Sequence, residues 1–328
     1  MSTDAMRRYV GDALLRHAET NEWDALRRIA RTAEGISPAG PPELALRACR
    51  AAGGADGDAY PAAASLHALH AGIHLVDDVI DGEERSIVEL PPGLRANLAM
   101  ALQSIAVELL AEAPGELRAP LMLAAAAAGR ETARGQELDA AGAADEEAYW
   151  RIVEAKTPPL FTAALRMGAL SGGAPAETAE ALAAAGVPLG VLIQLGDDLG
   201  DVMGHEIHPD WRRPGDNVAL RFALEADHPD RDRFHALVPR VPAEPAAHAQ
   251  AKEILVRSGA FAFCVHHMRV AADAARRAVL AVPLADAAPV LEFVDLLAAP
   301  VDDLLAQVGV DEDELAGDGL LALELTAA

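Results

Sequence analysis

Two stretches of the chain each carry three aspartates in the same D-D-x-x-D spacing. They are Asp77, Asp78 and Asp81 in HAGIHLVDDVID, and Asp197, Asp198 and Asp201 in GVLIQLGDDLGD. In a helix, side chains four residues apart lie on one face, so the carboxylates of each stretch can converge on one cation or on two neighbouring ones. Hard oxygen ligands suit Mg²⁺, which often bridges carboxylates to substrate phosphates. One such motif is usually a solvated helix end, but its recurrence favours two helices that hold Mg²⁺ around a polyphosphate.

Other polar residues accompany the aspartates. His67, His70 and His74 share a stripe with the first motif, but they do not have the partners that a zinc site requires. Lysine occurs only at 156 and 252, so Lys156 in EAKTPP is either a surface residue near a helix end or a cation directed at the site. Gln194 lies one turn before the second motif and shares its face, although a buried glutamine satisfied by the backbone is an alternative.

The elements that must position these residues are expected to be helices. Alanine and leucine dominate, aromatic residues make up 4%, and β-branched residues are scarce, so the chain is predicted to be all-α. Apolar residues recur at helical spacing over 4–34 (one or two helices), 62–81, 94–112, 117–139, 145–170, 176–203, 215–226, 246–280 and 286–308. We expect one bundle over 35–310, N-terminal helices (1–34) packed on it, and a tail (311–328).

Charge and composition exclude several classes of protein. The net charge of −24 disfavours nucleic acid and anionic membrane surfaces as partners. Two distant cysteines fit a reducing cytoplasm, and the N-terminus lacks the apolar region of a signal peptide. The longest apolar run falls far short of the roughly 20 residues that span a bilayer, so no transmembrane segment is expected.

The motifs occur in an order that is similar to a known family. Between the aspartate motifs stand GQELD (135–139), YWRIVEAKTPPLF (149–161) and GVPLGVLIQLGDD (186–198). Over residues 62–204 the chain thereby resembles the trans-isoprenyl diphosphate synthases, or polyprenyl synthetases. The resemblance implies a single-domain antiparallel helical bundle around a deep apolar cavity, usually as a homodimer. It also implies a magnesium-dependent prenyltransferase of isoprenoid biosynthesis, which ionises an allylic prenyl diphosphate and condenses it with isopentenyl diphosphate or another acceptor.

The resemblance also implies roles for individual residues. All six aspartates of the two motifs would hold Mg²⁺, and Lys156 would contact the diphosphate. Thr157 and Gln194 would lie near the cationic carbons. Further substrate-binding residues would be His70, Arg85, Arg212 and Arg213, with Leu69, Gly72 and Ile73 as the cavity floor. Gly72 is expected to leave that floor open for a longer substrate.

The chain departs from the family where isopentenyl diphosphate would bind. The usual G-G-K-x-x-R-P is replaced by GISPAGPPELALRACR, in which Arg47 and Arg50 are the cations. Arg85 alone follows the first motif where Arg-Arg-Gly is usual, and Arg212 and Arg213 follow the second in place of a lysine. A cyclase-like enzyme without an acceptor site therefore stays open, although the N-D-x-x-S-x-x-x-E motif of ordinary cyclases is missing. A non-catalytic subunit is the third reading, and such subunits tend to lose the aspartate motifs. The sequence does not specify the acceptor or the product.

Overall fold

The computed structural model describes residues 2–20, 22–82 and 86–307 of the chain. Within these residues every regular element is helical, which confirms the all-α prediction. The α-helices are α1 (Ser2–Thr20), α2 (Asp24–Thr32), α3 (Pro41–Ala52), α4 (Tyr60–Ile80), α5 (Pro92–Leu109), α6 (Gly115–Ala141), α7 (Glu146–Lys156), α8 (Pro158–Ser171), α9 (Ala176–Ala183), α10 (Gly186–Met203), α11 (Val218–Glu225), α12 (Arg231–Leu237), α13 (Pro245–Arg257), α14 (Ala260–Leu280) and α15 (Ala288–Gln307). Short 3₁₀ helices are η1 (Ala33–Gly35), η2 (Asp56–Ala59), η3 (Leu110–Glu112), η4 (Pro209–Arg212), η5 (Pro214–Asp216) and η6 (Val238–Arg240).

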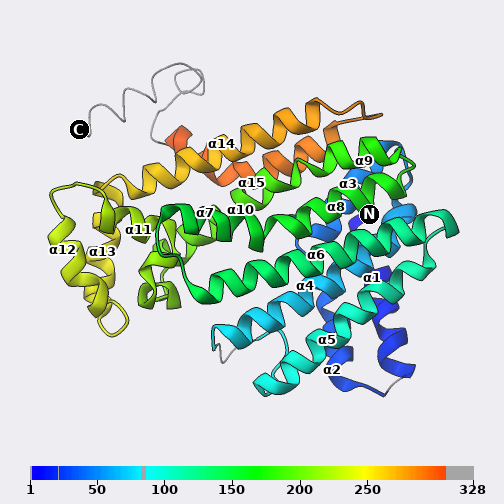
Figure 1. Cartoon of the computed structure of the whole chain (residues 1–328), viewed down its shortest axis with the longest axis horizontal. Coiled ribbons are helices and arrows are strands. Elements are labelled where there is room, and N and C mark those ends of the chain that lie inside the picture. The colour runs from blue at the N-terminus through cyan, green and yellow to red at the C-terminus, as the bar shows by residue number, and fades with distance from the viewer. Residues whose placement is uncertain (1, 21, 83–85, 308–328) are drawn as a thin grey trace.

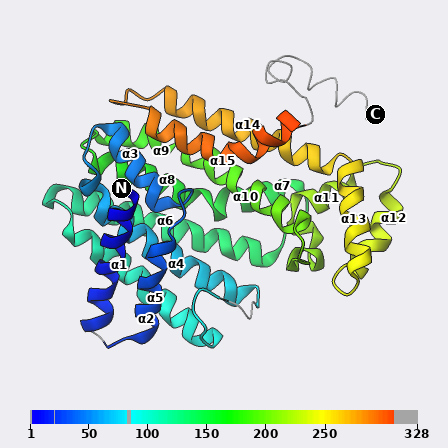
Figure 2. The same ribbon diagram turned by 180° about the vertical axis from the view of Figure 1, so that it is seen from behind.

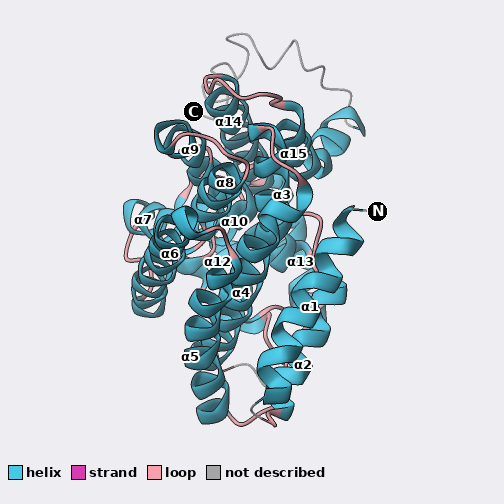
Figure 3. Cartoon of the chain, turned by 90° about the vertical axis from the view of Figure 1, so that its right-hand side faces the viewer, coloured by secondary structure: helices cyan, strands magenta, loops and turns pink. Residues whose placement is uncertain are grey.

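The long helices form a bundle whose axes run along the length of the molecule (Figure 1). Helices α8 and α10 lie in its middle, α14 and α15 cover one side, α4 and α5 lie on the other, and α6 lies with α7 at an outer edge (Figure 3). The short helices α11, α12 and α13 gather at one end, toward which α4, α6 and α10 point their C-terminal ends. The aspartate motifs occupy the ends of α4 and α10, so the bundle brings both motifs to the same end of the molecule.

The N-terminal helices α1 and α2 pack on the outside of the bundle (Figure 2). Seen end-on, they lie on the side opposite α6 and α7 (Figure 3). Met6, Val10 and Leu14 of α1 are fully buried and join the same continuous core as the rest of the bundle. The division of the chain into N-terminal helices (1–34), a bundle (35–310) and a tail stays a prediction. The tail (311–328) lies outside the described residues.

Several helix boundaries differ from the predictions, and prolines and glycines explain most of them. The predicted helix 145–170 is broken at Thr157, because Pro158 and Pro159 begin α8 and, having no backbone N–H, cannot continue the hydrogen bonds of α7. The predicted helix 246–280 is broken at Gly259, which has a φ of 88°. Helix α3 was missed, since Pro41 and Pro42 resemble a break in the sequence but occupy the first helical turn, where proline fits. Helix α12 was missed as well.

Two helical stretches are longer and more apolar than the apolar runs on which the expectation of no transmembrane segment was based. Pro92–Glu112 and Ala176–Met203 have the length and composition of membrane spans. The bundle buries 44% and 50% of them, respectively, and the second carries the aspartates of the second motif. Packing inside the bundle therefore accounts for much of their apolar character, and they are weak evidence for a membrane.

Candidate functional site

The first aspartate motif lies at the C-terminal end of α4. Asp77 and Asp78 belong to its last turn, and Asp81 is its C-cap residue. Asp77 Oδ1 accepts hydrogen bonds from Lys156 and Gln136, and Asp78 Oδ2 accepts one from the Ser86 hydroxyl. Burial of its carboxyl group and the charge of Asp77 raise the pKa of Asp81 to about 6. The end of α4 thus gathers carboxylates that repel one another and attract cations.

Lys156, the last residue of α7, lies between the two motifs. Its Nζ is 2.8 Å from Asp139 Oδ2 and 3.2 Å from Asp77 Oδ1. Burial alone would lower the pKa of Lys156, but these two carboxylates outweigh it and raise the pKa well above its ordinary value. The charge of Lys156 also opposes the rise in the pKa of Asp81 and of Asp197, whose main cause is burial. One protonated lysine is therefore in contact with Asp77 of the first motif and with Asp139, and its charge extends to Asp197 of the second motif.

A close approach of α6 to α7 makes this arrangement possible. A Cβ atom at Gly135 would lie 2.3 Å from the carbonyl oxygen of Ala155, so only glycine lets the two backbones come this near. The contact places Gln136 and Asp139, one turn of α6, beside Asp77 and Lys156. Sequence reasoning quoted the segment GQELD without giving these two residues a role. Their i, i+3 spacing after a glycine was the signal that could have found them.

The three aspartates of the second motif have different surroundings. The carboxylate of Asp197 makes no hydrogen bond in the described part of the chain. Burial together with the charge of Asp201 raises its pKa to about 6. Asp201 Oδ1 lies 3.6 Å from His208 Nε2, and His208 Nδ1 lies 3.0 Å from Asp210 Oδ1. Asp201, His208 and Asp210 are close enough together to hold one metal ion. Sequence reasoning did not include His208 or Asp210.

Asp198 is turned into the protein, and only 4% of it is exposed. Its Oδ2 accepts hydrogen bonds from the Tyr149 hydroxyl (2.7 Å) and the Val218 N–H (3.0 Å), and its Oδ1 accepts one from Gln194 Nε2 (2.9 Å). Burial raises the pKa of Asp198 to about 7, although these three donors lower it. Both oxygens are thus engaged away from the other aspartates. This is at odds with the prediction that all six aspartates bind metal, because neighbouring residues of a helix point about 100° apart.

Gln194 connects Asp198 to the junction of α7 and α8. The Thr157 hydroxyl donates to Gln194 Oε1 at 2.8 Å, while Gln194 Nε2 donates to Asp198. Asn217, fully buried, caps α11 and donates to the backbone oxygen of Asp198 at 2.8 Å. The structure therefore brings the predicted residues Thr157 and Gln194 together, next to Lys156.

The predicted cations after the motifs have different positions. Arg213 Nη2 donates to the backbone oxygen of Asp139 at 3.0 Å, and its Nε pairs with Asp216 at 2.8 Å. Arg212 is exposed, and Arg85 lies outside the described residues. Asp216 in turn accepts from the Ala143 N–H at 2.7 Å, which fastens the segment after α10 to the end of α6. Arg213 thus lies at the edge of the site.

The predicted substrate-binding residues before the first motif lie against different parts of the bundle. His70 Nε2 lies 2.9 Å from His74 Nε2, and burial together with the neighbouring imidazoles lowers the pKa of His70 to about 3. Leu69 is buried toward Gly129 of α6, and Ile73 packs against the core. Gly72 faces α5, where an added Cβ would lie 3.3 Å from the Ala99 carbonyl oxygen. The expectation that Gly72 leaves a floor open is therefore wrong, because α5 fills that space.

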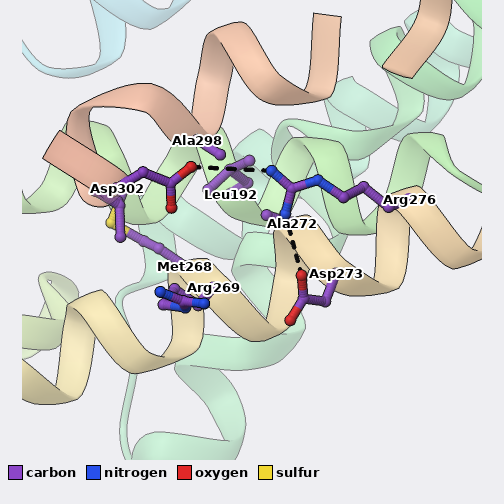
Figure 4. Close-up of a pocket in the computed structure, with 9 residues that line it drawn as sticks. Leu192, Met268, Arg269, Ala272, Asp273, Arg276, Ala298 and Asp302 are labelled. Atoms are coloured by element: carbon purple, nitrogen blue, oxygen red, sulfur yellow. Dashed lines mark hydrogen bonds and ion pairs between the residues drawn. The ribbon is translucent and has the colours of Figure 1, made fainter. Parts of the chain in front are cut away.

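Two cavities lie apart from the aspartates. The first, of about 10 Å³, lies between α10, α14 and α15, where Arg276 pairs with Asp273 and Asp302 (Figure 4). It has room for about one water molecule. The second is an open groove of about 720 Å³ along α6, α7 and α8. Neither is lined by a residue of the two motifs, and a cavity for a prenyl chain beneath the aspartates stays a prediction.

Known proteins are similar to this chain in sequence and in fold. The family model of polyprenyl synthetases matches residues 42–209, half of the chain. A (2E,6E)-farnesyl diphosphate synthase of Mycobacterium bovis is 34% identical over 175 residues, 50% of this chain and 48% of that protein, so the match spans about half the length of this relative. A short chain isoprenyl diphosphate synthase of Methanothermobacter thermautotrophicus is 26% identical over 82% of this chain and 90% of its own.

A solved structure extends the likeness to the whole fold. It is a polyprenyl synthase from Caulobacter crescentus complexed with calcium and isoprenyl diphosphate. It is 26% identical, with a TM-score of 0.69 over 88% of this chain and 97% of that one. The chain belongs to the polyprenyl synthetase family and has its all-α isoprenoid synthase fold.

Proposed function

We propose that the protein is a magnesium-dependent prenyltransferase that ionises an allylic prenyl diphosphate. The observation that carries the proposal is the contact of Lys156 with Asp77 of the first motif and with Asp139, at a place where its charge also lowers the pKa of Asp197 in the second motif. Heterolysis of the allylic C–O bond leaves the electron pair on the diphosphate, and nearby cations must neutralise this charge. The allylic cation is then attacked by the double bond of an acceptor, and a proton is lost. Farnesyl and short-chain isoprenyl diphosphate synthases among the relatives support this chemistry.

The donor atoms fit Mg²⁺. In the described part of the chain, Asp77 Oδ2 and the carboxylates of Asp81 and Asp197 make no hydrogen bond, so they can turn toward a cation. These three residues would hold the metal, and Asp201 would add to them on the second helix. Magnesium ions, when bound, would neutralise the diphosphate and act as Lewis acids. Asp78 accepts from Ser86 through Oδ2 alone, so its Oδ1 could also turn toward a cation, whereas Asp198 accepts hydrogen bonds on both oxygens and would support the site indirectly.

Lys156 and its neighbours would bind the leaving group. The ammonium is protonated over the whole neutral range, because Asp77 and Asp139 hold it. A diphosphate oxygen would compete with these carboxylates for its donors, since charge-assisted hydrogen bonds are the strong ones. Thr157 and Gln194, adjacent to this lysine, would border the reacting carbons.

Release of diphosphate tests the proposal. The protein is incubated with Mg²⁺ and dimethylallyl, geranyl, farnesyl or geranylgeranyl diphosphate, each with and without isopentenyl diphosphate. Inorganic diphosphate is measured, and products are identified by mass spectrometry. We expect magnesium-dependent release from at least one allylic diphosphate. If none is released from any of them under either condition, the proposed function is wrong.

A second candidate, a cyclase-like enzyme without an isopentenyl acceptor, is favoured by one observation. Arg47, which could replace the missing lysine, pairs with Glu43 at 3.2 Å and donates to the backbone of α15. Arg50 pairs with Asp56 at 2.6 Å. Both arginines of α3 are thus engaged by the protein itself, which weakens binding of a second diphosphate. Hydrocarbon or alcohol products formed without isopentenyl diphosphate would support this candidate, and elongated diphosphates would exclude it.

The third reading is a non-catalytic subunit of another synthase. Retention of both aspartate motifs, and of Lys156 between them, argues against it. Calorimetric titration with Mg²⁺ and inorganic diphosphate tests it directly. A protein that binds neither would fit a subunit rather than an enzyme.

Two further proposals concern the surroundings of the enzyme. A homodimer is supported by the exposure of large apolar side chains on α5 and α6, with Met100 66% and Leu123 71% exposed. A place in the cytoplasm is supported by the buried, free cysteines Cys49 and Cys264 and by the family.

A further inference from the structure

We propose that Asp198 is a positioning residue that orients Gln194 and Thr157 for the allylic cation, and that it is not a metal ligand; the inference rests on the proposed function. The geometry behind it is a partly buried relay of hydrogen bonds that ends on the buried carboxylate of Asp198. Asp198 Oδ1 accepts from Gln194 Nε2 at 2.9 Å, and Gln194 Oε1 accepts from the Thr157 hydroxyl at 2.8 Å.

The direction of the relay follows from the chemistry of its first member. An ionised carboxylate can only accept hydrogen bonds, so the Gln194 group that faces Asp198 must be the amide nitrogen. The amide oxygen of Gln194 then faces Thr157, whose single hydroxyl hydrogen is used to reach it. What Thr157 can offer any other neighbour is therefore the lone pairs of its oxygen. Lone pairs stabilise a positive charge, whereas a hydroxyl hydrogen would repel it.

The surroundings of Asp198 hold its carboxylate in place. The N–H of Val218 is a backbone donor that cannot reverse, and it contacts Oδ2 at 3.0 Å together with the Tyr149 hydroxyl at 2.7 Å. Asn217 donates to the backbone oxygen of the same residue at 2.8 Å. These contacts come from α7 and from the start of α11, while Asp198 and Gln194 belong to α10. The orientation of Gln194 is therefore set by its own helix and two others. Three of the roughly four acceptor positions of the carboxylate are thus taken by protein donors, two on Oδ2 and one on Oδ1.

The inference identifies one substitution that reverses the relay. In Asp198→Asn, the amide oxygen keeps the Val218 N–H, so the new NH₂ group faces Gln194. The Gln194 amide must flip to accept from it, and its own NH₂ group then faces Thr157. The Thr157 hydroxyl becomes an acceptor in the relay, and its hydrogen is freed to point toward the site. The shape of the protein is kept while the electrostatics at Thr157 change sign.

Binding of a stable cation measures this change independently of turnover. The probe is protonated 3-methylbut-2-enylamine, titrated by calorimetry in the presence of Mg²⁺ and inorganic diphosphate. We expect Asp198→Asn to weaken amine binding about tenfold and to leave binding of Mg²⁺ and diphosphate alone within about twofold. Asp197→Asn, the matched variant next to it, should weaken binding of Mg²⁺ and diphosphate instead.

A double-mutant cycle separates positioning from a general loss of structure. If Asp198 acts through Thr157, Thr157→Val should weaken amine binding as much as Asp198→Asn, and the double variant should be no weaker than either. Gln194→Met breaks the same relay and serves if Asp198→Asn does not fold.

Multiplied losses in the double variant would overturn the inference, and so would wild-type amine affinity in both Asp198→Asn and Gln194→Met. Loss of diphosphate binding in Asp198→Asn would make it a metal ligand. A wild type that binds no diphosphate with Mg²⁺ would instead count against the proposed function, and the inference would fall with it.

Discussion

At the scale of single residues, the site depends on a lysine that contacts the first motif and whose charge extends to the second. Lys156 holds Asp77 and Asp139 at 3.2 Å and 2.8 Å, and its charge reaches Asp197 as well. The chain has a net charge of −24, so an anionic leaving group needs a nearby cation such as this lysine in order to bind. Arg212 and Arg213 are the other candidates, but Arg213 is paired with Asp216.

Replacement of Lys156 tests its role in diphosphate binding. Lys156→Met removes the charge and keeps most of the side-chain volume, so we expect kcat/KM for the allylic diphosphate to fall at least about 100-fold. The control is Lys252→Met, at the only other lysine. Lys252 Nζ donates to the Gly204 carbonyl oxygen at 2.8 Å, at the end of α10, so its loss should lower Tm and change kcat/KM less than about threefold. Equal kinetic losses in the two variants would contradict the special role of Lys156.

A buried histidine predicts how stability depends on pH. Burial lowers the pKa of His67 to about 4, below its ordinary value of 6.5, so the folded protein holds the neutral form. The stability this contributes is present above about pH 6.5 and is lost as the pH falls toward 4, and it amounts to roughly 3 kcal/mol at most. In chemical unfolding, wild type should therefore lose about 3 kcal/mol relative to His67→Gln as the pH falls from about 6.5 to 4. A gap that is independent of pH would show that His67 is not neutral for this reason.

At the scale of elements, most long helices were predictable and several of their ends were not. Periodic apolar residues located α4, α5, α6 and α15 within a few residues, because each buries one face in the bundle, whereas the predicted helix 176–203 is divided into α9 and α10. Prolines misled the prediction in two directions: Pro41 and Pro42 begin α3, whereas Pro158 and Pro159 end α7 by beginning α8. The sequence alone does not show whether a proline pair starts a helix or interrupts one.

The candidate site was predictable in part for a related reason. The D-D-x-x-D spacing identified both motifs, and the structure joins Thr157 to Gln194 and Lys156 to Asp77, while the roles of these residues stay predictions. The spacing did not show that Asp198 is buried, because that depends on Tyr149 and Val218, which come from other helices. Nor did it show that α5 packs against Gly72, which requires the relative position of two helices.

The contact between α6 and α7 gives a prediction at this scale. In Gly135→Ala the new methyl group would meet the Ala155 backbone, so the helices must separate, and we expect a loss of about 1–3 kcal/mol in the free energy of unfolding. Activity should fall as well, because Asp139 and Lys156 move apart. Gly93→Ala is the control, since an added Cβ there meets no atom within 4 Å. Denaturant titration measures both, and equal stability of the two variants would contradict the close packing.

At the scale of the whole molecule, the proposed homodimer requires an apolar surface that water would otherwise contact. Leu123 of α6 is 71% exposed and Met100 of α5 is 66% exposed. Leu123→Glu would place a charge in an interface formed by these helices, so we expect a shift from dimer to monomer in analytical ultracentrifugation. Val256→Glu is the control on a different helix, where 55% of the valine is exposed. A wild type that sediments as a monomer would contradict the proposal.

The central claim is that both aspartate motifs act on one allylic diphosphate with Mg²⁺. The most direct measurement is the rate of inorganic diphosphate release by wild type, Asp77→Asn and Asp197→Asn, with geranyl or farnesyl diphosphate and increasing Mg²⁺. We predict saturable, magnesium-dependent release by wild type, and a loss of at least about 100-fold in each variant at unchanged Tm. Release by the wild type that is unaffected by Mg²⁺, or variants that keep the wild-type rate, would contradict the account.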